Sequence, residues 1–278
     1  MAAPLNQVFF PSTFQELFSA WGRFPGAVPY AGGTGIIRGQ GRQTLELPPV
    51  ILSLDKLEDL QRISRSERYL EIGAMVKLSQ IIRLGKIVPE ALSRCLENIA
   101  GAQLRNIATI GGNICYPAER LDASAAFTAL DAQYELRSAQ SSRWISASRF
   151  SSLPGPTALN PQELLTRVRV PLDQWNYSVY KKFSGSPPGS GCGVVVFLVK
   201  NQKNALTDIR VVYKTAAILR DKNSEAILAG KQLPLSRRVA AEFVENWEIF
   251  LSGIQNLDEL SQKELLNFIE LNVYNLTE

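Results

Sequence analysis

Two glycine-centred turns are candidate sites for binding an anion. Residues 31–35 read Ala-Gly-Gly-Thr-Gly, residues 109–113 read Thr-Ile-Gly-Gly-Asn, and each turn adjoins an apolar stretch. Adjacent glycines let successive backbone N–H groups point into one concavity, and they lack the Cβ atom that would keep an anion away. A diphosphate needs more than one such turn, so the pair together predicts a bipartite phosphate site.

Neither turn matches a well-known nucleotide motif. The GxGxxG pattern that opens the helix of a dinucleotide-binding fold is absent, and no lysine follows either turn where a P-loop requires one. A Gly-Gly pair by itself is usually an ordinary turn. The phosphate interpretation therefore depends on the two turns acting together.

The chain contains no histidine. This excludes a Ser-His-Asp or Cys-His relay, a histidine-ligated metal and a histidyl-linked flavin, because each needs an imidazole. Cys95, Cys115 and Cys192 are isolated, which argues against a disulfide framework, a zinc site or a ligated iron–sulfur cluster, and we interpret them as buried thiols. Chemistry that needs a catalytic relay, a metal or a redox centre must then come from a bound cofactor.

Composition is that of an ordinary globular protein. The 278 residues are 45% hydrophobic, and 30 basic and 26 acidic residues give a formal charge of +4 without a basic block. This predicts no nucleic-acid or membrane surface as a partner, while acidic small molecules remain compatible. The first residues lack a signal-peptide pattern and the longest apolar run, residues 194–199, is far shorter than a membrane span, so the expected location is the cytoplasm.

Apolar periodicity and turn residues predict two regions of mixed helix and strand, divided near residue 175. In the first region, strands are expected at residues 27–31, 44–47, 50–54, 69–74, 133–137 and 168–170, and helices at 13–21, 78–84, 89–100, 123–130 and, as a helical turn, 157–165. In the second, residues 180–183 lead into a loop expected at 184–191, and two strands are expected at 193–200 and 207–214, with helices at 224–229, 236–251 and 261–273. Asp122 stands where it could be the N-cap of a helix.

Several segments occur in an order that resembles a known family. These are YAGGTGII, IAGAQLRNIATIGGNICYPAERLDASAAFTALDA, TALNPQELL, VRVP and YSVYKK. The order is similar to that of the FAD-binding subunit of molybdenum hydroxylases, a family that includes the flavin domain of xanthine dehydrogenase and the medium subunit of carbon monoxide dehydrogenase. The resemblance runs from about residue 5 to about residue 183 and continues more weakly at SEAILAGK.

The resemblance implies an α+β fold. Residues 1–175 would form a two-subdomain FAD-binding domain of the PCMH-like type, divided near residue 54. Residues 176–278 would form a small C-terminal α+β domain of the type found in the carbon monoxide dehydrogenase flavoprotein.

The resemblance also implies the residues that hold noncovalent FAD. The first turn would supply backbone N–H groups to the pyrophosphate from Ala31, Gly32, Gly33, Thr34, Gly35 and Ile36. The second turn would do so through Thr109, Gly111, Gly112 and Asn113. Asp122 would accept a hydrogen bond from a sugar hydroxyl, Leu165 would lie against the isoalloxazine, and Lys181 would lie near the ring. The alternatives are that Asp122 is only a helix cap, Leu165 only a core residue and Lys181 only a solvated charge.

The sequence departs from the family pattern in three places. Gly35 stands where the family often has a polar or acidic residue. After Lys181 the family commonly continues with arginine and an acidic residue, whereas this chain has SGSPPGSG. The C-terminal region also lacks the family's usual segment between its last strand and its helices.

The function that the resemblance implies is electron transfer. FAD would take electrons from iron–sulfur clusters on a partner subunit and pass them to NAD or another acceptor, while a separate molybdenum-binding subunit oxidises the substrate. This chain would carry no catalytic side chain and no metal of its own. The alternatives are an autonomous flavin-dependent reductase resembling the enolpyruvyl reductase of cell-wall synthesis, and a flavin-less assembly or scaffold subunit.

Overall fold

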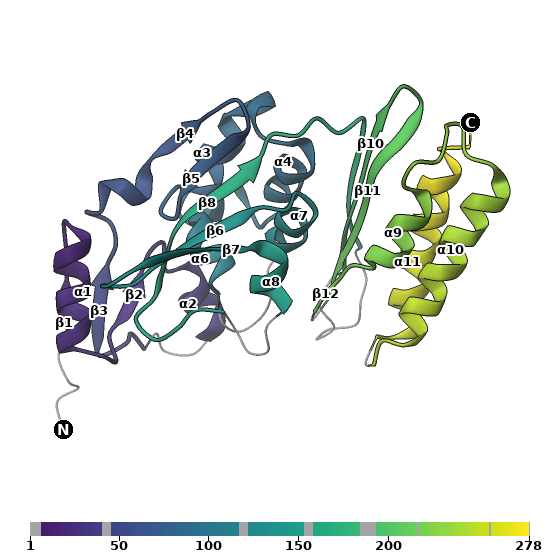
Figure 1. Ribbon diagram of the computed structural model, residues 1–278. Coiled ribbons are helices and arrows are strands. Elements are labelled where there is room, and N and C mark those ends of the chain that lie inside the picture. The colour runs from purple at the N-terminus through teal and green to yellow at the C-terminus, as the bar shows by residue number, and fades with distance from the viewer. Residues whose placement is uncertain are drawn as a thin grey trace.

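Three β-sheets follow one another along the chain, with helices packed between and beside them (Figure 1). The computed structural model describes residues 7–40, 46–116, 122–152, 158–183, 193–215, 217–255 and 257–277. The mixture of helix and strand confirms the α+β class. The strands of the three sheets lie within residues 7–53, 63–171 and 177–219, and the domain divisions near residues 54 and 175 stay predictions.

The first sheet is parallel, in the order β1 (Gln7–Phe9), β3 (Val50–Ser53) and β2 (Val28–Tyr30). Helix α1 (Phe14–Arg23) connects β1 to β2, and its cap is Thr13, whose hydroxyl accepts a 3.1 Å hydrogen bond from the amide of Glu16. Helix α2 (Thr34–Gln40) follows β2. The sequence predicts no helix there, because glycines at two of its seven positions give it a poor intrinsic propensity.

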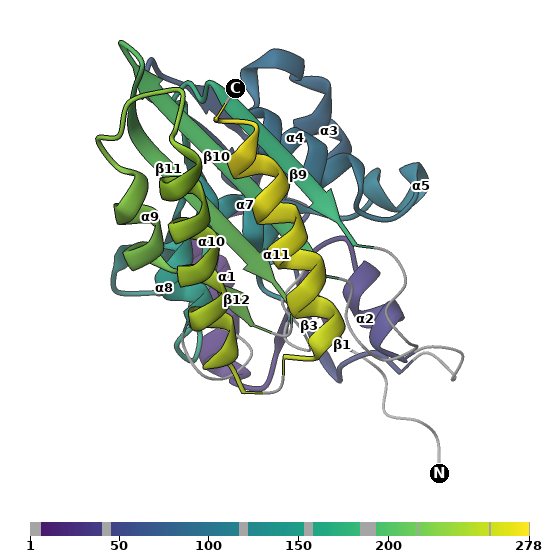
Figure 2. The same cartoon turned by 90° about the vertical axis from the view of Figure 1, so that its right-hand side faces the viewer.

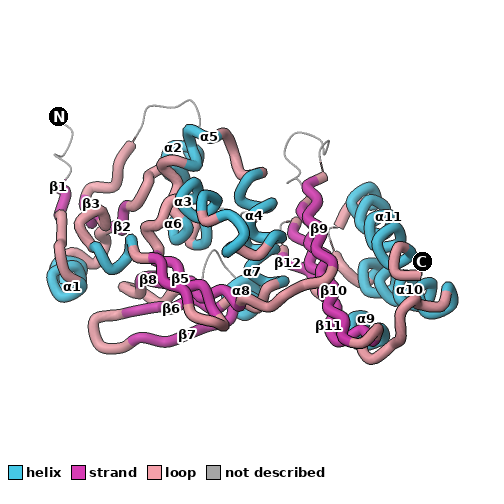
Figure 3. The backbone as a smooth tube through the Cα atoms, turned by 90° about the horizontal axis from the view of Figure 1, so that it is seen from above, coloured by secondary structure: helices cyan, strands magenta, loops and turns pink. Residues whose placement is uncertain are grey.

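The second sheet is antiparallel and has five strands, in the order β4 (Ile63–Arg65), β5 (Tyr69–Gly73), β8 (Leu164–Pro171), β6 (Gln133–Arg137) and β7 (Ser142–Ser146). Helices on one side of it include α3 (Leu78–Arg83), α4 (Glu90–Glu97) and α6 (Ile110–Ile114) (Figure 3). Helix α7 (Ala123–Ala129) packs against α4 and α6. The remaining short elements are η1 (Glu58–Gln61), η2 (Gly85–Ile87), α5 (Ala102–Arg105) and α8 (Ala147–Ser152).

Two expectations about local structure are wrong. Glu46 and Leu47 are not in a strand, and the rest of the strand expected at residues 44–47 lies outside the described residues. Residues 158–163 are not helical, and β8 begins at Leu164. The reason is the buried side chain of Glu163, which accepts two 2.7 Å hydrogen bonds from Arg143 and one of 2.9 Å from the amide of Asn160. These bonds favour a turn over a helix.

The third sheet is antiparallel, in the order β12 (Ile218–Leu219), β11 (Ala205–Lys214), β10 (Val194–Gln202) and β9 (Tyr177–Lys182). Helices α9 (Lys222–Leu228), α10 (Arg237–Ser252) and α11 (Glu259–Tyr274) cover one face (Figure 2). Because strand side chains alternate, Val195 and Phe197 pack under these helices, whereas Val194 and Val196 join the core of the second sheet. The sheet is therefore buried on both faces.

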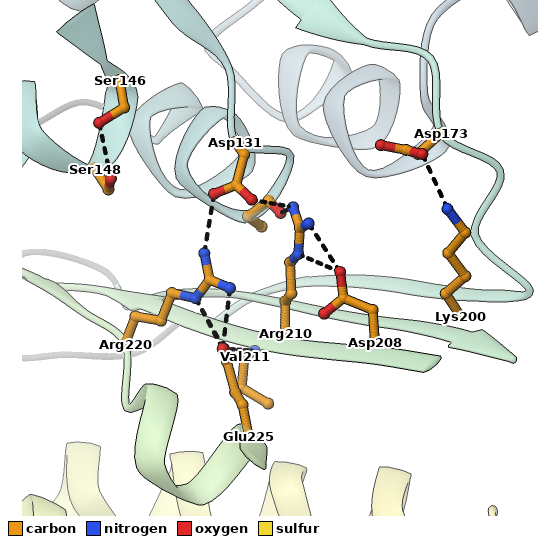
Figure 4. Close-up of polar contacts among 11 residues, drawn as sticks. Asp131, Ser146, Ser148, Asp173, Lys200, Asp208, Arg210, Val211, Arg220 and Glu225 are labelled. Atoms are coloured by element: carbon orange, nitrogen blue, oxygen red, sulfur yellow. Dashed lines mark hydrogen bonds and ion pairs between the residues drawn. The ribbon is translucent and has the colours of Figure 1, made fainter. Parts of the chain in front are cut away.

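Helix α7 is the element that joins the second and third sheets. It packs against β10 and β11, and six of its seven residues are buried. At its C-terminal end, the guanidinium of Arg210 on β11 donates a 2.7 Å hydrogen bond to the Ala129 carbonyl and pairs with Asp131 at 2.9 Å. Arg220 also pairs with Asp131, at 3.1 Å, and holds Glu225 at 2.9 Å (Figure 4). A cation at a helix C-terminus is favourable because it faces the negative end of the helix dipole.

Among the described residues, no helix combines the length and the apolar character that crossing a membrane would require.

Replacing Arg210 tests the contribution of this contact. Arg210→Met removes the bonds to Ala129 and Asp131, together with the 2.8 Å contact to Asp208, and we expect the free energy of unfolding to fall by about 1.5–3 kcal/mol. Lys200→Met is the control, because Lys200 pairs with Asp173 at the surface, where such pairs contribute about 0–1 kcal/mol. Urea titration of both variants measures the difference. Equal losses would contradict a special role for Arg210.

Candidate functional site

The two glycine turns lie against each other. The first turn leads from β2 into α2, and the second begins α6. A Cβ atom on Gly32 would collide with the backbone carbonyl of Ile107, just before the second turn, and one on Gly35 would lie 2.5 Å from the ring of Tyr116, just after it. The structure therefore brings together the two halves of the predicted phosphate site, although they are far apart in the sequence.

The second turn is held in place by backbone hydrogen bonds to the segment after β5. The amide of Ile110 donates to Val76 at 2.9 Å, and the amide of Gly111 donates to Ala74 at 2.8 Å. Thr109 is 3% exposed, and its hydroxyl accepts a 3.2 Å hydrogen bond from the amide of Gly112, capping α6. The side chain of Thr109 thus already has a structural role in shaping the turn.

The glycines of the two turns are needed for different reasons. Gly33 has a φ of +67°, and a Cβ there would collide with the hydroxyl of Tyr30, while a Cβ on Gly111 would lie 2.7 Å from that of Ala74. Gly112 is exposed, and a Cβ on it would meet only the Thr109 hydroxyl, at 3.0 Å. Packing within the chain therefore already explains the glycines at Gly33 and Gly111, and their contact with a phosphate stays a prediction. Gly112 is the position where packing does not explain the glycine.

Asn113 presents a polar atom that lacks a partner at the same turn. Its side chain is 9% exposed, and its amide oxygen Oδ1 makes no hydrogen bond among the described residues. Buried polar atoms in folded proteins are nearly always satisfied, and an exception calls for a ligand, a water or a functional reason. A ligand with a hydroxyl or amine donor beside the second turn would satisfy it.

Asp122 is not a helix cap. It stands immediately before α7, but its φ of −56° and ψ of −35° are helical, and its side chain makes no capping hydrogen bond. Instead, its Oδ2 lies 2.6 Å from Lys182 Nζ on β9, and its Oδ1 lies 3.5 Å from Lys214 Nζ on β11. The capping alternative is therefore wrong, because the carboxylate pairs across the interface between sheets. A hydrogen bond from Asp122 to a cofactor sugar stays a prediction.

Lys181 lies apart from the other predicted site residues. It is exposed on the edge strand β9, opposite Val195, whose side chain packs toward the C-terminal helices. Its neighbour Lys182 points to the opposite face and meets Asp122. The lysine that faces the second sheet is thus Lys182, because alternation along a strand reverses the face with each residue. Contact between Lys181 and a flavin ring stays a prediction.

Leu165 is a core residue. It is 2% exposed on β8 and lies opposite the buried Leu136 of β6, beside an irregularity in the strand register. This agrees with the core alternative for this position. Contact between Leu165 and a flavin ring stays a prediction.

The cysteines do not form a reactive or metal-binding group in the described part of the chain. Cys95 and Cys115 are free, and among the described residues no cluster of potential metal ligands occurs. Burial raises the pKa of Cys115 to about 12 and that of Cys95 further, so both thiols are protonated at neutral pH. Cys95 is buried as expected, Cys115 is only partly buried, and Cys192 lies outside the described residues.

Comparison with known proteins identifies the family. Residues 4–173 match the family described as the FAD binding domain in molybdopterin dehydrogenase. The chain belongs to this family. The match spans both glycine turns and ends just before β9, so it assigns the turns to a cofactor-binding domain and leaves the third sheet outside.

Named relatives of this family member are subunits or parts of oxidoreductases. The glyceraldehyde dehydrogenase medium chain of Sulfolobus acidocaldarius is 30% identical over 187 residues, which cover 66% of this chain and 66% of that protein. The nicotine 6-hydroxylase medium subunit of Paenarthrobacter nicotinovorans is 26% identical, over 76% of this chain and 75% of that protein. Xanthine dehydrogenase 2 of Arabidopsis thaliana is 28% identical over 80% of this chain, which spans only 18% of that protein.

A solved structure shares the whole fold. Quinoline 2-oxidoreductase from Pseudomonas putida 86 contains a chain that matches with a TM-score of 0.79 and 21% identity, covering 100% of this chain and 97% of that chain. The C-terminal sheet and helices, which lie beyond the family match, are therefore part of the shared architecture.

The residues of the two turns fit FAD. Helix α2 begins at the first turn, and the first N–H groups of a helix lack partners within it, so they are available to a pyrophosphate. At the start of α6, the amides of Ile110, Gly111 and Gly112 already donate hydrogen bonds within the chain, so the second turn lies beside the first as a rigid wall. The exposed Gly112 leaves space for it, and the unpartnered Oδ1 of Asn113 offers an acceptor. When bound, FAD supplies the redox chemistry that the side chains of this chain do not.

Gly112 gives a direct test of the site. Gly112→Val places a branched side chain where the backbone faces open space, and we expect FAD affinity to fall by at least about tenfold, or 1.4 kcal/mol. The fold should persist, because Gly112 lies within a helix without a positive φ and valine is a better helix former than glycine. Flavin fluorescence titration measures the affinity, and thermal melting of the apoprotein measures the fold.

The matched control is Gly26→Val, since a Cβ on Gly26 meets nothing within 4 Å and lies outside both turns. This variant should retain wild-type FAD affinity. If Gly112→Val binds FAD as the control does, Gly112 is an ordinary turn residue.

Proposed function

We propose that this chain is the FAD-binding electron-transfer subunit of a molybdenum hydroxylase complex. In this proposal FAD is held between the two glycine turns, receives electrons from iron–sulfur clusters on one partner subunit and delivers them to NAD or another acceptor. A second partner carries the molybdenum cofactor and oxidises the substrate. The complex would act in the cytoplasm, as the sequence predicts.

The observation that carries the proposal is the meeting of the two turns. Gly32 of the first turn touches the backbone that leads into the second, so the N-termini of α2 and α6 are brought to one place. One helix start with a glycine turn is common in proteins, whereas two that converge fit the two linked phosphates of FAD. Membership of the FAD-binding family supports the same assignment.

This chain's own residues would bind and orient the cofactor. Backbone amides at the first turn would hold the pyrophosphate beside Gly112, and the hydrogen bonds of Ile110 and Gly111 to the segment after β5 keep the second turn rigid before the cofactor arrives. A preformed site of this kind binds with less loss of conformational entropy. No side chain of the chain is assigned a role in proton transfer or bond cleavage.

Partner subunits follow from the ligands that this sequence lacks. It contains no histidine and three cysteines, whereas a [2Fe–2S] cluster needs four thiolate ligands. Several named relatives are medium chains or FAD subunits, names that belong to proteins with further subunits. In this proposal the source of the electrons lies on a partner subunit and their destination is NAD or another acceptor.

The cofactor assignment predicts that FAD is bound without a covalent link, since the chain has no histidine to form the histidyl attachment. Acid denaturation of the purified yellow protein should release all flavin into the supernatant, where its absorption spectrum and mass identify it as FAD. A colourless purified protein that also fails to bind added FAD would favour the scaffold alternative. Flavin that pellets with the chain would show a covalent bond.

The subunit assignment predicts stable partners. Affinity purification of the tagged chain from its native host should recover two further polypeptides, one with iron and labile sulfide and one with molybdenum. Metal analysis of the eluted complex checks both. Recovery of a lone flavoprotein that turns over a substrate by itself would contradict this assignment and favour the autonomous reductase.

A further inference from the structure

A buried cluster of charged side chains lies at the start of α7, where the second and third sheets meet. Asp122 lies between the ammonium groups of Lys182 and Lys214, at 2.6 Å and 3.5 Å. The side chain of Lys214 is 7% exposed and that of Asp122 is 13% exposed. Lys214 is therefore a charged group held almost entirely away from water, and its one ion pair among the described residues is long.

Among the described residues, the cluster holds one more positive charge than negative. Two ammonium groups share one carboxylate, and no second carboxylate of the described residues lies within ion-pair distance of either lysine. The other titratable groups of the described part of the chain that face the cluster are Cys95 on α4 and Tyr180 on β9, and burial raises the pKa of both, so they are neutral at neutral pH. A buried charge without a partner is costly, and such a site favours an anion.

The cluster is close to the glycine turns. Helix α7, which begins at Asp122, packs directly against α6, the helix that the second turn opens. The same helix packs against β10 and β11, and Lys214 is the last residue of β11. Helix α6 thus begins at the predicted pyrophosphate site, and the positive charge lies at the start of α7, the helix that packs against α6.

We propose that Lys182 and Lys214, positioned by Asp122, form a cationic subsite for bound FAD that favours its reduced form. Oxidised FAD takes up two electrons, supplied by the partner's iron–sulfur centre, and one proton, so the isoalloxazine gains one negative charge. A fixed positive charge nearby stabilises that state relative to the neutral oxidised ring. This inference rests on the proposed function and adds residues that set how easily the cofactor is reduced.

The midpoint potential of FAD bound to the full chain tests the proposal. Lys214→Met keeps the length of the buried side chain but removes its charge, and we expect about a tenfold weaker preference for reduced over oxidised FAD. For a two-electron couple that corresponds to a midpoint about 30 mV more negative. Lys182→Met should shift the midpoint in the same direction. Reductive titration against a reference dye measures it, while the affinity for oxidised FAD should stay within about twofold.

Two further variants make the sign of the effect decisive. Asp122→Asn preserves the shape of the side chain and removes the negative charge of the cluster, so the midpoint should move the other way, to more positive values. Lys200→Met removes the same charge at the surface, where Lys200 pairs with Asp173, and should leave the midpoint unchanged. A shift in Lys200→Met without one in Lys214→Met would overturn the proposal.

The outcomes separate this inference from the proposed function. If the wild-type chain binds no FAD, both are wrong. If FAD binds and Lys214→Met has the wild-type midpoint, only the inference is wrong. The remaining case is tested by calorimetry of inorganic pyrophosphate binding to the apoprotein. If Lys214→Met binds pyrophosphate more weakly but keeps the wild-type midpoint, the cluster is a phosphate subsite. That result would also overturn the inference.

Discussion

Helix α7 and its contacts at both ends are the interaction on which the rest of the structure depends. Its small, buried residues let it pack between the second and third sheets. Asp122 before its first turn pairs with lysines of β9 and β11, and Arg210 of β11 binds the carbonyl of Ala129 at its last turn. Ion pairs therefore join the two sides at both ends of α7, with acidic groups beside the helix and basic groups from the third sheet.

This arrangement connects the fold to the site. The second glycine turn opens α6, α6 packs on α7, and α7 packs on the third sheet, so a change in the position of that sheet would reach the turn through packed side chains. The glycines of the first turn belong to the same system, because Gly32 and Gly35 are needed where the chain around the second turn passes close to them. Four of the five glycines in the two turns are thus explained by close packing within the chain, and the role of Gly112 at a phosphate stays a prediction.

Electrostatics divides the interface between the sheets into two parts. At the C-terminal end of α7 the charges of Arg210, Arg220 and Asp131 belong to a satisfied network with Asp208 and Glu225. At the N-terminal end, nearer α6, two lysines share one carboxylate. A protein that needed only to join its sheets would gain from neutralising both ends. The imbalance among the described residues lies at the end of α7 that follows α6, the helix that the second glycine turn begins.

The sequence by itself determined the family, the two glycine turns and most helices and strands, because these depend on local signals: the apolar period of 2 or 3.6, caps such as Thr13, and glycine pairs. It failed at α2, where two glycines lower the helix propensity, and at residues 158–163, where the distant Arg143 binds Glu163. Only the tertiary structure decided that Lys182 rather than Lys181 faces the second sheet, and that Lys214 joins it. Side chains alternate between the two faces of a strand, so an error of one residue places the wrong lysine on a given face. The pairing of Lys214 with Asp122 joins residues that are far apart in the chain, so the sequence near either residue carries no sign of it.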